Sequence, residues 1–311
     1  MFDFTQIADG VHVIPIPVDG GSSSINVFVL GARESAIVVD AGLDSMAAEV
    51  IATLEQNGYG PGHVRALVIT HAHQDHYGAA GALAAWSAAE VWAHPSGVSQ
   101  MEDAWDHFNA WHIVSPGASP KAWEDFRAQQ GKPLRVARLL REGDRIEHAG
   151  LKLHVLHTPG HDRTEISLFE PRLRIVFVGD LVQGGFDAAG NWLGLFTDPA
   201  GQRRSLERVR ALDPAILCKT HRKPRLGAEV KADLAAALQR LVKLDAALIE
   251  ALNEKSPQPL GALVRAAFRK VLNREQQEVP NYAAVTVNAF LMDLARRGLI
   301  RQTPDLLWEK V

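Results

Sequence analysis

Cysteine is nearly absent from this sequence of 311 residues, in which Cys218 is the single example. One cysteine cannot form a disulfide within the chain, so we expect no disulfide framework and a reducing compartment. Cys218 ends the apolar run Ala215-Ile216-Leu217-Cys218. We therefore expect it to be a buried strand residue and not a reactive or ligating thiol.

Long hydrophobic runs and an excess of charge are lacking as well. No segment reaches the roughly 18 apolar residues that indicate a membrane span, and Met1-Phe2-Asp3-Phe4 does not begin a secretion signal. The formal net charge of -3 supplies no broad basic field for nucleic acid or an anionic membrane. We expect a cytoplasmic protein that does not bind a membrane, and non-specific binding to polyanions such as nucleic acid is disfavoured.

Short apolar segments, in contrast, are frequent and alternate with turns and helices. With 47% hydrophobic residues, a chain of this length can bury one large core and a smaller one, which predicts two domains. The first series contains strands 11–16, 24–30 and 35–39, helix 45–56 and strand 66–70; the second contains strands 151–156, 165–169 and 174–178, helix 205–212 and strand 215–218. Two such halves predict an α/β sandwich of sheets covered by helices.

The pattern changes twice along the chain. Between residues 97 and 139 the sequence becomes polar, helix-like and rich in aromatics, namely Trp105, Phe108, Trp111, Trp123 and Phe126. This insertion either packs a small core of its own or forms a lid over a substrate pocket. After Pro224, leucines recur at helical spacing over 228–253, and further helices are expected at 260–271 and 282–297. A short hairpin at 299–311 completes a winged-helix-like shape, for which packing or homodimer formation is favoured over nucleic-acid binding.

A cluster of metal-ligand residue types follows the predicted strand 66–70. His71, His73, Asp75 and His76 lie within six residues, at the end of a rigid element that can hold ligands in place. Imidazole and carboxylate together suit zinc, iron or manganese. The density of such groups exceeds what a structural role requires, so the run predicts a metal site.

Three further candidate ligands each come just past a predicted strand. They are His161 in Thr158-Pro159-Gly160-His161, Asp180 after Val178-Gly179, and His221 after Thr220. Each one alone would more often be a surface or hydrogen-bonded residue. Their order after the first cluster favours a shared metal site.

With these residues in place, the sequence resembles the metallo-beta-lactamase superfamily. Its five recurrent motifs match Asp40, residues 71–76, His161, Asp180 and His221, over roughly residues 8–224. The resemblance implies a four-layer αββα sandwich over residues 1–224, with the helical insertion at about 97–139. A helical winged-helix-like domain at 225–311 resembles the tail of the lactamase-beta-2-like group.

The resemblance also implies how the ligands are divided. His71, His73 and His161 would hold a first metal, Asp75, His76 and His221 a second, and Asp180 would bridge both. Two divalent ions are expected, with Zn²⁺ as the first choice and iron or manganese as alternatives. Asp40 would either orient a ligand histidine or cap the next helix.

Two adjacent ions explain the chemistry that such a site performs. They share a water molecule and lower its pKa towards about 7, so that a bridging hydroxide attacks an ester-like carbonyl or a phosphorus. Asp75 is the candidate catalytic residue, because it could steer the hydroxide and carry its proton to the leaving group.

Differences between this sequence and individual branches of the superfamily narrow the range of expected reactions. Asp180 stands where some zinc beta-lactamases have a cysteine ligand, and His73 stands where the iron flavoprotein branch usually has an acidic residue. The ligand set instead looks like that of glyoxalase II, quorum-quenching lactonases and related thioesterases. One motif is atypical, because Thr220 and Arg222 flank His221 where relatives usually have glycines.

The residues near the predicted ligands favour a small apolar substrate. Phe186, Trp192 and Phe196, together with the aromatic insertion, suit the acyl part of a thioester or lactone. The alternatives are a metal-dependent endoribonuclease or phosphodiesterase, which Arg222, Lys223 and Arg225 would serve, and beta-lactam hydrolysis. A non-enzymatic binding module would predict the loss of at least one ligand, and none is missing.

Overall fold

The structure is a computed structural model that describes residues 2–21, 23–112, 120–128, 131–183 and 192–311. It divides into two compact units. The first unit comprises residues 1–157, 164–180 and 212–230, and the second comprises residues 158–163, 181–211 and 231–311. The predicted domain boundary after residue 224 stays a prediction, because the second unit also takes up two segments from the middle of the chain.

A seven-stranded sheet forms one layer of the first unit, with its strands in chain order. Its strands are β1 (Thr5–Ala8), β2 (Val11–Val18), β3 (Ser23–Ala32), β4 (Ser35–Val39), β5 (Val64–Val68), β6 (Glu90–Ala93) and β7 (Val136–Leu139). The pairs from β1 to β4 are antiparallel and those from β4 to β7 are parallel. β7 lies at the end of the stretch for which helices were expected.

A six-stranded sheet forms the second layer, in the order β13-β12-β11-β10-β9-β8. Its strands are β8 (Arg145–His148), β9 (Leu151–His157), β10 (Ile166–Glu170), β11 (Ile175–Phe177), β12 (Ile216–Cys218) and β13 (Arg225–Leu226). β11 and β12 are parallel, although more than 30 residues separate them in sequence. Cys218 in β12 is fully buried, as predicted.

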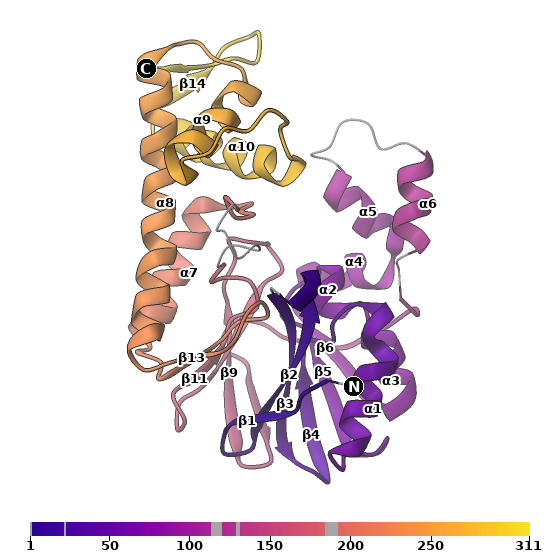
Figure 1. The fold of residues 1–311 in the computed structure, drawn as a ribbon. Coiled ribbons are helices and arrows are strands. Elements are labelled where there is room, and N and C mark those ends of the chain that lie inside the picture. Colours follow the sequence, from indigo (N-terminus) through magenta and orange to yellow (C-terminus); the bar gives the residue numbers. More distant parts are fainter. Residues whose placement is uncertain (1, 22, 113–119, 129–130, 184–191) are drawn as a thin grey trace. The chain divides into compact units, whose positions relative to one another are not determined.

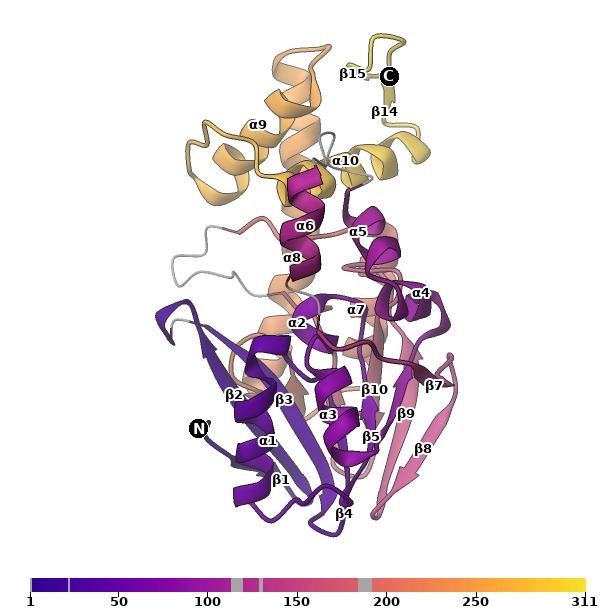
Figure 2. The same cartoon turned by 90° about the vertical axis from the view of Figure 1, so that its right-hand side faces the viewer.

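The alternation of side chains along the strands creates two cores. In β3, Phe28 and Leu30 face the second sheet, and the Phe28 ring lies 5.2 Å from that of Phe177. Val27 and Val29 face the opposite side of the strand, where they pack with α1 (Ala47–Gln56) and α3 (Ala80–Ser87). Both helices cover the outer face of the seven-stranded sheet (Figures 1 and 2). The predicted layered α/β architecture is therefore present.

The insertion is helical, as the sequence predicts. It contains α4 (Val98–Glu102), α5 (Ala104–His112) and α6 (Pro120–Ala128). The rings of Trp105, Phe108, Trp123 and Phe126 stack or meet edge to face at centroid distances of 5.0 to 6.2 Å. The side chain of Trp111 lies outside the described part of the chain.

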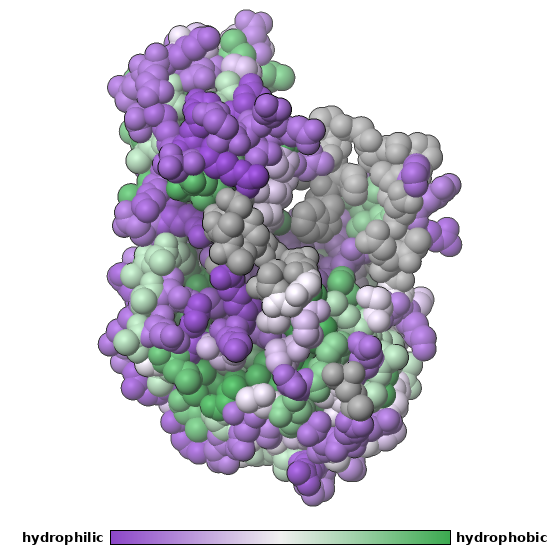
Figure 3. Space-filling view, in the orientation of Figure 1, coloured by the Kyte–Doolittle hydropathy of each residue, from purple (hydrophilic) through white to green (hydrophobic). Residues whose placement is uncertain are grey.

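The second unit consists mainly of helices. They are α7 (Pro199–Ala211), most of α8 (Ala228–Glu254), α9 (Leu260–Leu272) and α10 (Asn281–Arg296), followed by the hairpin of β14 (Ile300–Gln302) and β15 (Trp308–Lys310). α8 buries Leu234, Leu241, Leu244 and Leu248 at the predicted helical spacing. The visible surface over α9 and α10 is mostly hydrophilic (Figure 3). The predicted C-terminal helices and hairpin are confirmed. Among the described residues, no helix combines the length and apolar character needed to cross a bilayer.

Candidate metal centre

The first cluster of predicted ligands occupies the connection from β5 to the short helix α2 (Gln74–Tyr77). α2 lies at one end of the sheets (Figure 1). The side chains of His71 and His76 are completely buried, and His73 is 8% exposed. Their rings gather closely, with centroids 3.8 Å apart for His71 and His76 and 4.3 Å apart for His71 and His73. Buried imidazole nitrogens need a hydrogen-bond or metal partner, and rings this close together can share one.

Ligands from distant strands join this cluster within the first unit. His71, His76 and Asp180 can each point one ligand atom to a common position, since those atoms all lie within 4.8 Å of one another. The same holds for Asp75, His76 and His221. The two groups overlap at His76, so the structure brings five of the predicted ligands together in one cluster.

The distances between these donor atoms suit metal coordination better than they suit hydrogen bonds. His76 Nε2 is buried and makes no hydrogen bond to any described residue. It lies 3.7 Å from Asp75 Oδ2 and 3.8 Å from Asp180 Oδ1, which is too long for a hydrogen bond. His221 Nε2 lies 3.1 Å from Asp75 Oδ2 and 3.4 Å from Asp180 Oδ2. Nitrogen and oxygen donors in this arrangement suit a divalent cation such as zinc, iron or manganese.

The carboxylates around the cluster control the charge of the histidines. Burial lowers the pKa of His76, but Asp40, Asp75 and Asp180 outweigh it and raise the pKa to about 9. In the same way burial lowers the pKa of His221, whereas Asp180 and Asp75 raise it well above its usual value. Burial would raise the pKa of Asp75, yet His76 and His221 hold it far below its usual range. The site therefore attracts positive charge, as protons on imidazole or as a metal that replaces them.

Asp40 orients His76, which is one of the two roles predicted for it. It follows β4 and accepts a hydrogen bond from His76 Nδ1 at 2.9 Å. It also accepts bonds from the Thr70 backbone N–H at 2.9 Å and from the Thr220 hydroxyl at 3.0 Å. With Nδ1 held by Asp40, Nε2 is the nitrogen of His76 that is turned to the ligands. The residues at the N-cap positions before α1, Leu43 and Met46, make no side-chain capping bond.

Glu165 is a buried residue of the site that the sequence analysis placed only in a strand. It is completely buried, and its Oε1 accepts a hydrogen bond from the Asp180 backbone N–H at 2.7 Å. A Cβ on Gly179 would lie 3.0 Å from this Oε1 and 2.8 Å from Thr70 Oγ1. Glu165 thus fixes the backbone that presents Asp180. The sequence feature that could have identified Glu165 is an acidic residue beside an apolar run.

The atypical residues around His221 have structural roles of their own. Arg222 has a φ of 73°, a left-handed conformation for which glycine is the usual residue. Asn26 of β3 stabilises this turn, because its side-chain amide donates to the carbonyls of Lys219, at 2.9 Å, and Arg222. Thr220 replaces the other expected glycine and bonds Asp40 through its hydroxyl. The turn keeps its geometry by hydrogen bonding instead of by glycine.

His161 belongs to the second unit, where its ring is fixed from one side. His161 Nδ1 lies 2.9 Å from the carbonyl oxygen of Leu195. The Gln183 side-chain amide contacts the same nitrogen, so Nδ1 is held by Leu195 and Gln183, and a metal would bind through Nε2. Its assignment to the first metal stays a prediction.

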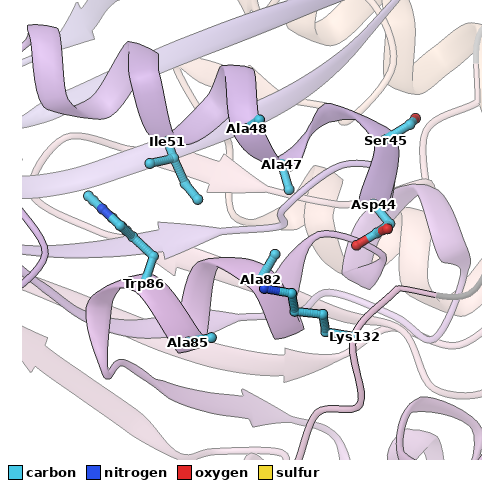
Figure 4. Close-up of a pocket in the computed structure, with 9 residues that line it drawn as sticks. All are labelled: Asp44, Ser45, Ala47, Ala48, Ile51, Ala82, Ala85, Trp86 and Lys132. Atoms are coloured by element: carbon cyan, nitrogen blue, oxygen red, sulfur yellow. The ribbon is translucent and has the colours of Figure 1, made fainter.

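A cavity of about 480 Å³ lies elsewhere in the first unit, between α1 and α3. Ala47, Ala48 and Ile51 of α1 face Ala82, Ala85 and Trp86 of α3 (Figure 4). Its ionisable lining residues are Asp44 and Lys132, which do not form a set of metal ligands. The metal-ligand cluster is therefore the candidate functional site.

Comparison with known proteins identifies relatives that include a thioesterase and an uncharacterized protein. The acyl-coenzyme A thioesterase MBLAC2 of Gallus gallus is 31% identical over 197 residues, which cover 59% of this chain and 67% of that protein. An uncharacterized protein of Aquifex aeolicus is 26% identical over 229 residues, which cover 70% of this chain and 93% of that protein.

Solved structures share the fold over nearly the whole chain. A metallo-beta-lactamase family protein from Thermus thermophilus has a TM-score of 0.78 at 21% identity and covers 98% of this chain and 100% of its own. A beta-lactamase domain protein from Burkholderia ambifaria has a TM-score of 0.72 at 22% identity, covering 99% and 94%. The predicted fold class, an αββα sandwich with a C-terminal helical region, is confirmed. The model of the metallo-beta-lactamase superfamily matches residues 20–221, and the chain belongs to this superfamily of metal-dependent hydrolases.

Proposed function

We propose that the protein is a binuclear metal-dependent hydrolase of acyl thioesters, with lactones as the related second class of substrate. The observation that carries this proposal is the convergence of five donor residues, which are more than a single four-coordinate ion binds: His71, Asp75, His76, Asp180 and His221. Asp180 supports two neighbouring ions, because its carboxylate lies within 4.8 Å of donor atoms of both His71, a proposed ligand of the first metal, and His76, a proposed ligand of the second. A carboxylate in that position is suited to bridge two cations.

The proposed ligand assignment follows the family resemblance. His71, His73 and His161 hold the first metal, Asp75, His76 and His221 hold the second, and Asp180 bridges both. Zn²⁺ is the first choice for both positions, and iron or manganese also suits these donors. When bound, two such ions polarise a carbonyl and supply a nucleophile at neutral pH by lowering the pKa of water.

The residues of the chain then have separate tasks. Asp40 keeps the His76 ring in one orientation, and Glu165 keeps the Asp180 backbone in place. Asp75 is proposed as the catalytic residue that moves a proton to the leaving group. Its side chain is 27% exposed, whereas that of His76 is fully buried, so Asp75 is the ligand that a substrate can reach.

The substrate class rests on the thioesterase relative and on the aromatic insertion. The Trp105 ring is half exposed at one end of the α5–α6 aromatic cluster. At the other end, His107 of α5 lies beside Phe126 and is joined to Tyr77 of α2 by a 2.5 Å hydrogen bond. Tyr77 directly follows the ligand His76. An aromatic surface connected to the metal loop suits the apolar acyl part of a thioester.

Several finer predictions extend this proposal. The insertion serves as a lid or packs only on itself, the C-terminal region supports a homodimer, and the protein is cytoplasmic. Phe186, one of the aromatic residues expected near the substrate, lies outside the described residues.

A substrate panel tests the proposed reaction. The zinc-loaded protein is assayed with acyl-coenzyme A esters of increasing chain length, a series of lactones, a cephalosporin and single-stranded RNA. The proposal predicts thioester hydrolysis that increases with acyl length and is abolished by His73→Ala. His63→Ala is the matched control, because His63 accepts a bond from the Gly60 backbone N–H in a turn. Cleavage of RNA alone, abolished by His73→Ala, would overturn the thioester proposal and favour the endoribonuclease alternative.

A further inference from the structure

We propose that the C-terminal helices position the metal ligand His161, and that they do so through the hydroxyl of Thr286 in α10. This inference rests on the proposed function, in which His161 holds the first metal. It gives the helical region after residue 230 a role in the metal centre that does not require a binding partner. All the residues that carry it belong to the second unit.

The orientation of His161 depends on the Leu195 peptide group and on Gln183. Leu195 O lies 2.9 Å from His161 Nδ1 and accepts a hydrogen bond from the side-chain amide of Gln183 at 2.8 Å. The same amide contacts His161 Nδ1, and the Leu195 backbone N–H donates to Gln183 Oε1 at 2.8 Å. Leu195 and Gln183 therefore hold the Nδ1 side of the His161 ring together.

Thr286 holds the chain on both sides of Leu195. Its hydroxyl donates to Gly194 O at 2.8 Å and accepts from the Phe196 backbone N–H at 3.1 Å. The side chain is completely buried. A threonine within a helix usually bonds its own helix or points to solvent, whereas this hydroxyl uses both its donor and its acceptor on another segment.

Aromatic contacts from the same helix reinforce the hydroxyl. The Trp192 ring stacks on Tyr282 of α10 with centroids 3.7 Å apart, and the Phe196 ring meets Phe290 of α10 edge to face at 6.0 Å. From α8, the guanidinium of Arg240 donates to the Trp192 carbonyl at 3.3 Å. Segment 192–196 is thus fixed at both ends by the C-terminal helices, and Leu195 lies between these contacts.

The segment is also joined directly to the backbone of the ligand. The Thr197 hydroxyl donates to His161 O at 3.1 Å, and the Thr197 backbone N–H donates to Gly160 O at 2.8 Å. A Cβ on Gly160 would lie 2.5 Å from Gln202 Cα, so α7 closes on this turn. A shift of segment 194–197 would therefore move both the ring and the backbone of His161.

Thr286 is accordingly a positioning residue. Groups that orient a metal ligand typically change metal affinity by about 10- to 100-fold when they are removed. Thr286→Val keeps the shape of the side chain and removes the hydroxyl, which leaves the Phe196 N–H and the Gly194 carbonyl without this partner. Thr286→Ser restores the hydroxyl. Thr303→Val is the matched control, because Thr303 Oγ1 accepts the Leu307 N–H in the C-terminal hairpin.

The experiment measures metal affinity and ligand geometry on the full-length chain. Zinc binding is followed by competition with a chelator, and the coordination geometry by the visible absorption of the cobalt-substituted protein. Thr286→Val is expected to weaken the binding of one of the two ions by about 10- to 100-fold and to change the cobalt spectrum. Thr286→Ser and Thr303→Val are expected to match the wild type. Where a thioester is hydrolysed, Thr286→Val lowers kcat more than it changes KM.

The outcomes separate this inference from the proposed function. Wild-type zinc affinity and an unchanged cobalt spectrum in Thr286→Val, in a protein with native circular dichroism, would overturn the inference. Equal losses in Thr286→Val and Thr303→Val would also overturn it, because they would show a general loss of stability. A wild-type protein that binds two ions but cleaves no thioester overturns the proposed substrate and leaves the affinity comparison decisive. A wild-type protein that binds fewer than two ions overturns both.

Discussion

Two networks of charged residues in this protein both contain aspartates, but they differ in burial and in the residues that balance the aspartate charge. In the second unit, Arg203 donates to Asp245 at 2.7 Å and to Asp293 at 2.9 Å, and Arg297 reaches the same two carboxylates. In the first unit, carboxylates surround His76, whose Nε2 makes no hydrogen bond to a described residue.

The difference separates a structural network from a metal site. Arginine carries a fixed charge, so Arg203 and Arg297 stay paired with Asp245 and Asp293 as long as these carboxylates are ionised. Histidine carries a charge that a metal can replace. The network built with arginine is therefore expected to contribute stability, and the one built with histidine is expected to exchange protons for divalent ions.

The largest effect is expected from loss of His76. His76→Ala removes the histidine that lies in both donor groups of the first unit and is a proposed ligand of the second metal, so hydrolysis should fall by about a thousandfold or more, since the metals supply several kcal/mol of barrier lowering. The kcat of the zinc-loaded variant against the best thioester measures this. An activity within tenfold of the wild type would contradict a role of His76 as a metal ligand.

The opposite result is expected for the arginine network. Arg203→Ala leaves Arg297 as the remaining arginine partner of Asp245 and Asp293, and because the network is partly exposed, the loss is expected to cost about 1 kcal/mol. Urea unfolding measures the loss, and zinc stoichiometry should not change. Arg204→Ala is the control, since that side chain is 71% exposed. If Arg204→Ala destabilises the protein as much, the network has no special role.

Removal of the orienting carboxylate is expected to have a smaller effect on metal binding. Asp40→Asn keeps the size of the side chain but weakens its bond to His76 Nδ1, so zinc affinity should fall by about 10- to 100-fold. Chelator competition measures the affinity. Asp44→Asn at the cavity of Figure 4 is the control. Equal zinc affinity in Asp40→Asn and the wild type would mean that Asp40 does not orient the ligand.

The smallest effect concerns a pair of stacked histidines outside the metal-ligand cluster. His94 stacks on His157 at 4.2 Å, and burial, His157 and Arg141 together lower its pKa to about 4 from 6.5. The unfolded chain then binds more protons between these two pH values, so this residue makes stability rise as pH increases from 4 to 6.5. His94→Asn should flatten the dependence of Tm on pH in that range. An unchanged slope would show that His94 does not contribute to it.

The helices and strands of the fold could be predicted from the sequence because they depend on periodic patterns of apolar residues. Alternating Val27, Phe28, Val29 and Leu30 face two different cores, and the leucines of α8 recur at helical spacing. Ligands in the connections that follow strands were recognisable from residue type and position, as at His71 after β5 and Asp180 after β11.

The residues that hold the ligands in place could not be predicted from the sequence, because their hydrogen-bond partners are distant in sequence. Asn26 bonds the carbonyls of Lys219 and Arg222, and Thr286 bonds Gly194 and Phe196. Their sequence neighbourhoods are an ordinary strand and an ordinary helix, with no motif. Division of the chain into units also depends on such contacts, which is why segments 158–163 and 181–211 join the C-terminal helices.

The number of bound metal ions tests the central claim most directly. Elemental analysis of the full-length protein, equilibrated with zinc and separated from free metal, should give two ions per chain. Asp180→Ala, which removes the proposed bridge, should give about one ion or fewer while its circular dichroism stays native. One ion or none in the wild type, or two ions retained in Asp180→Ala with wild-type affinity, would contradict a binuclear centre bridged by Asp180.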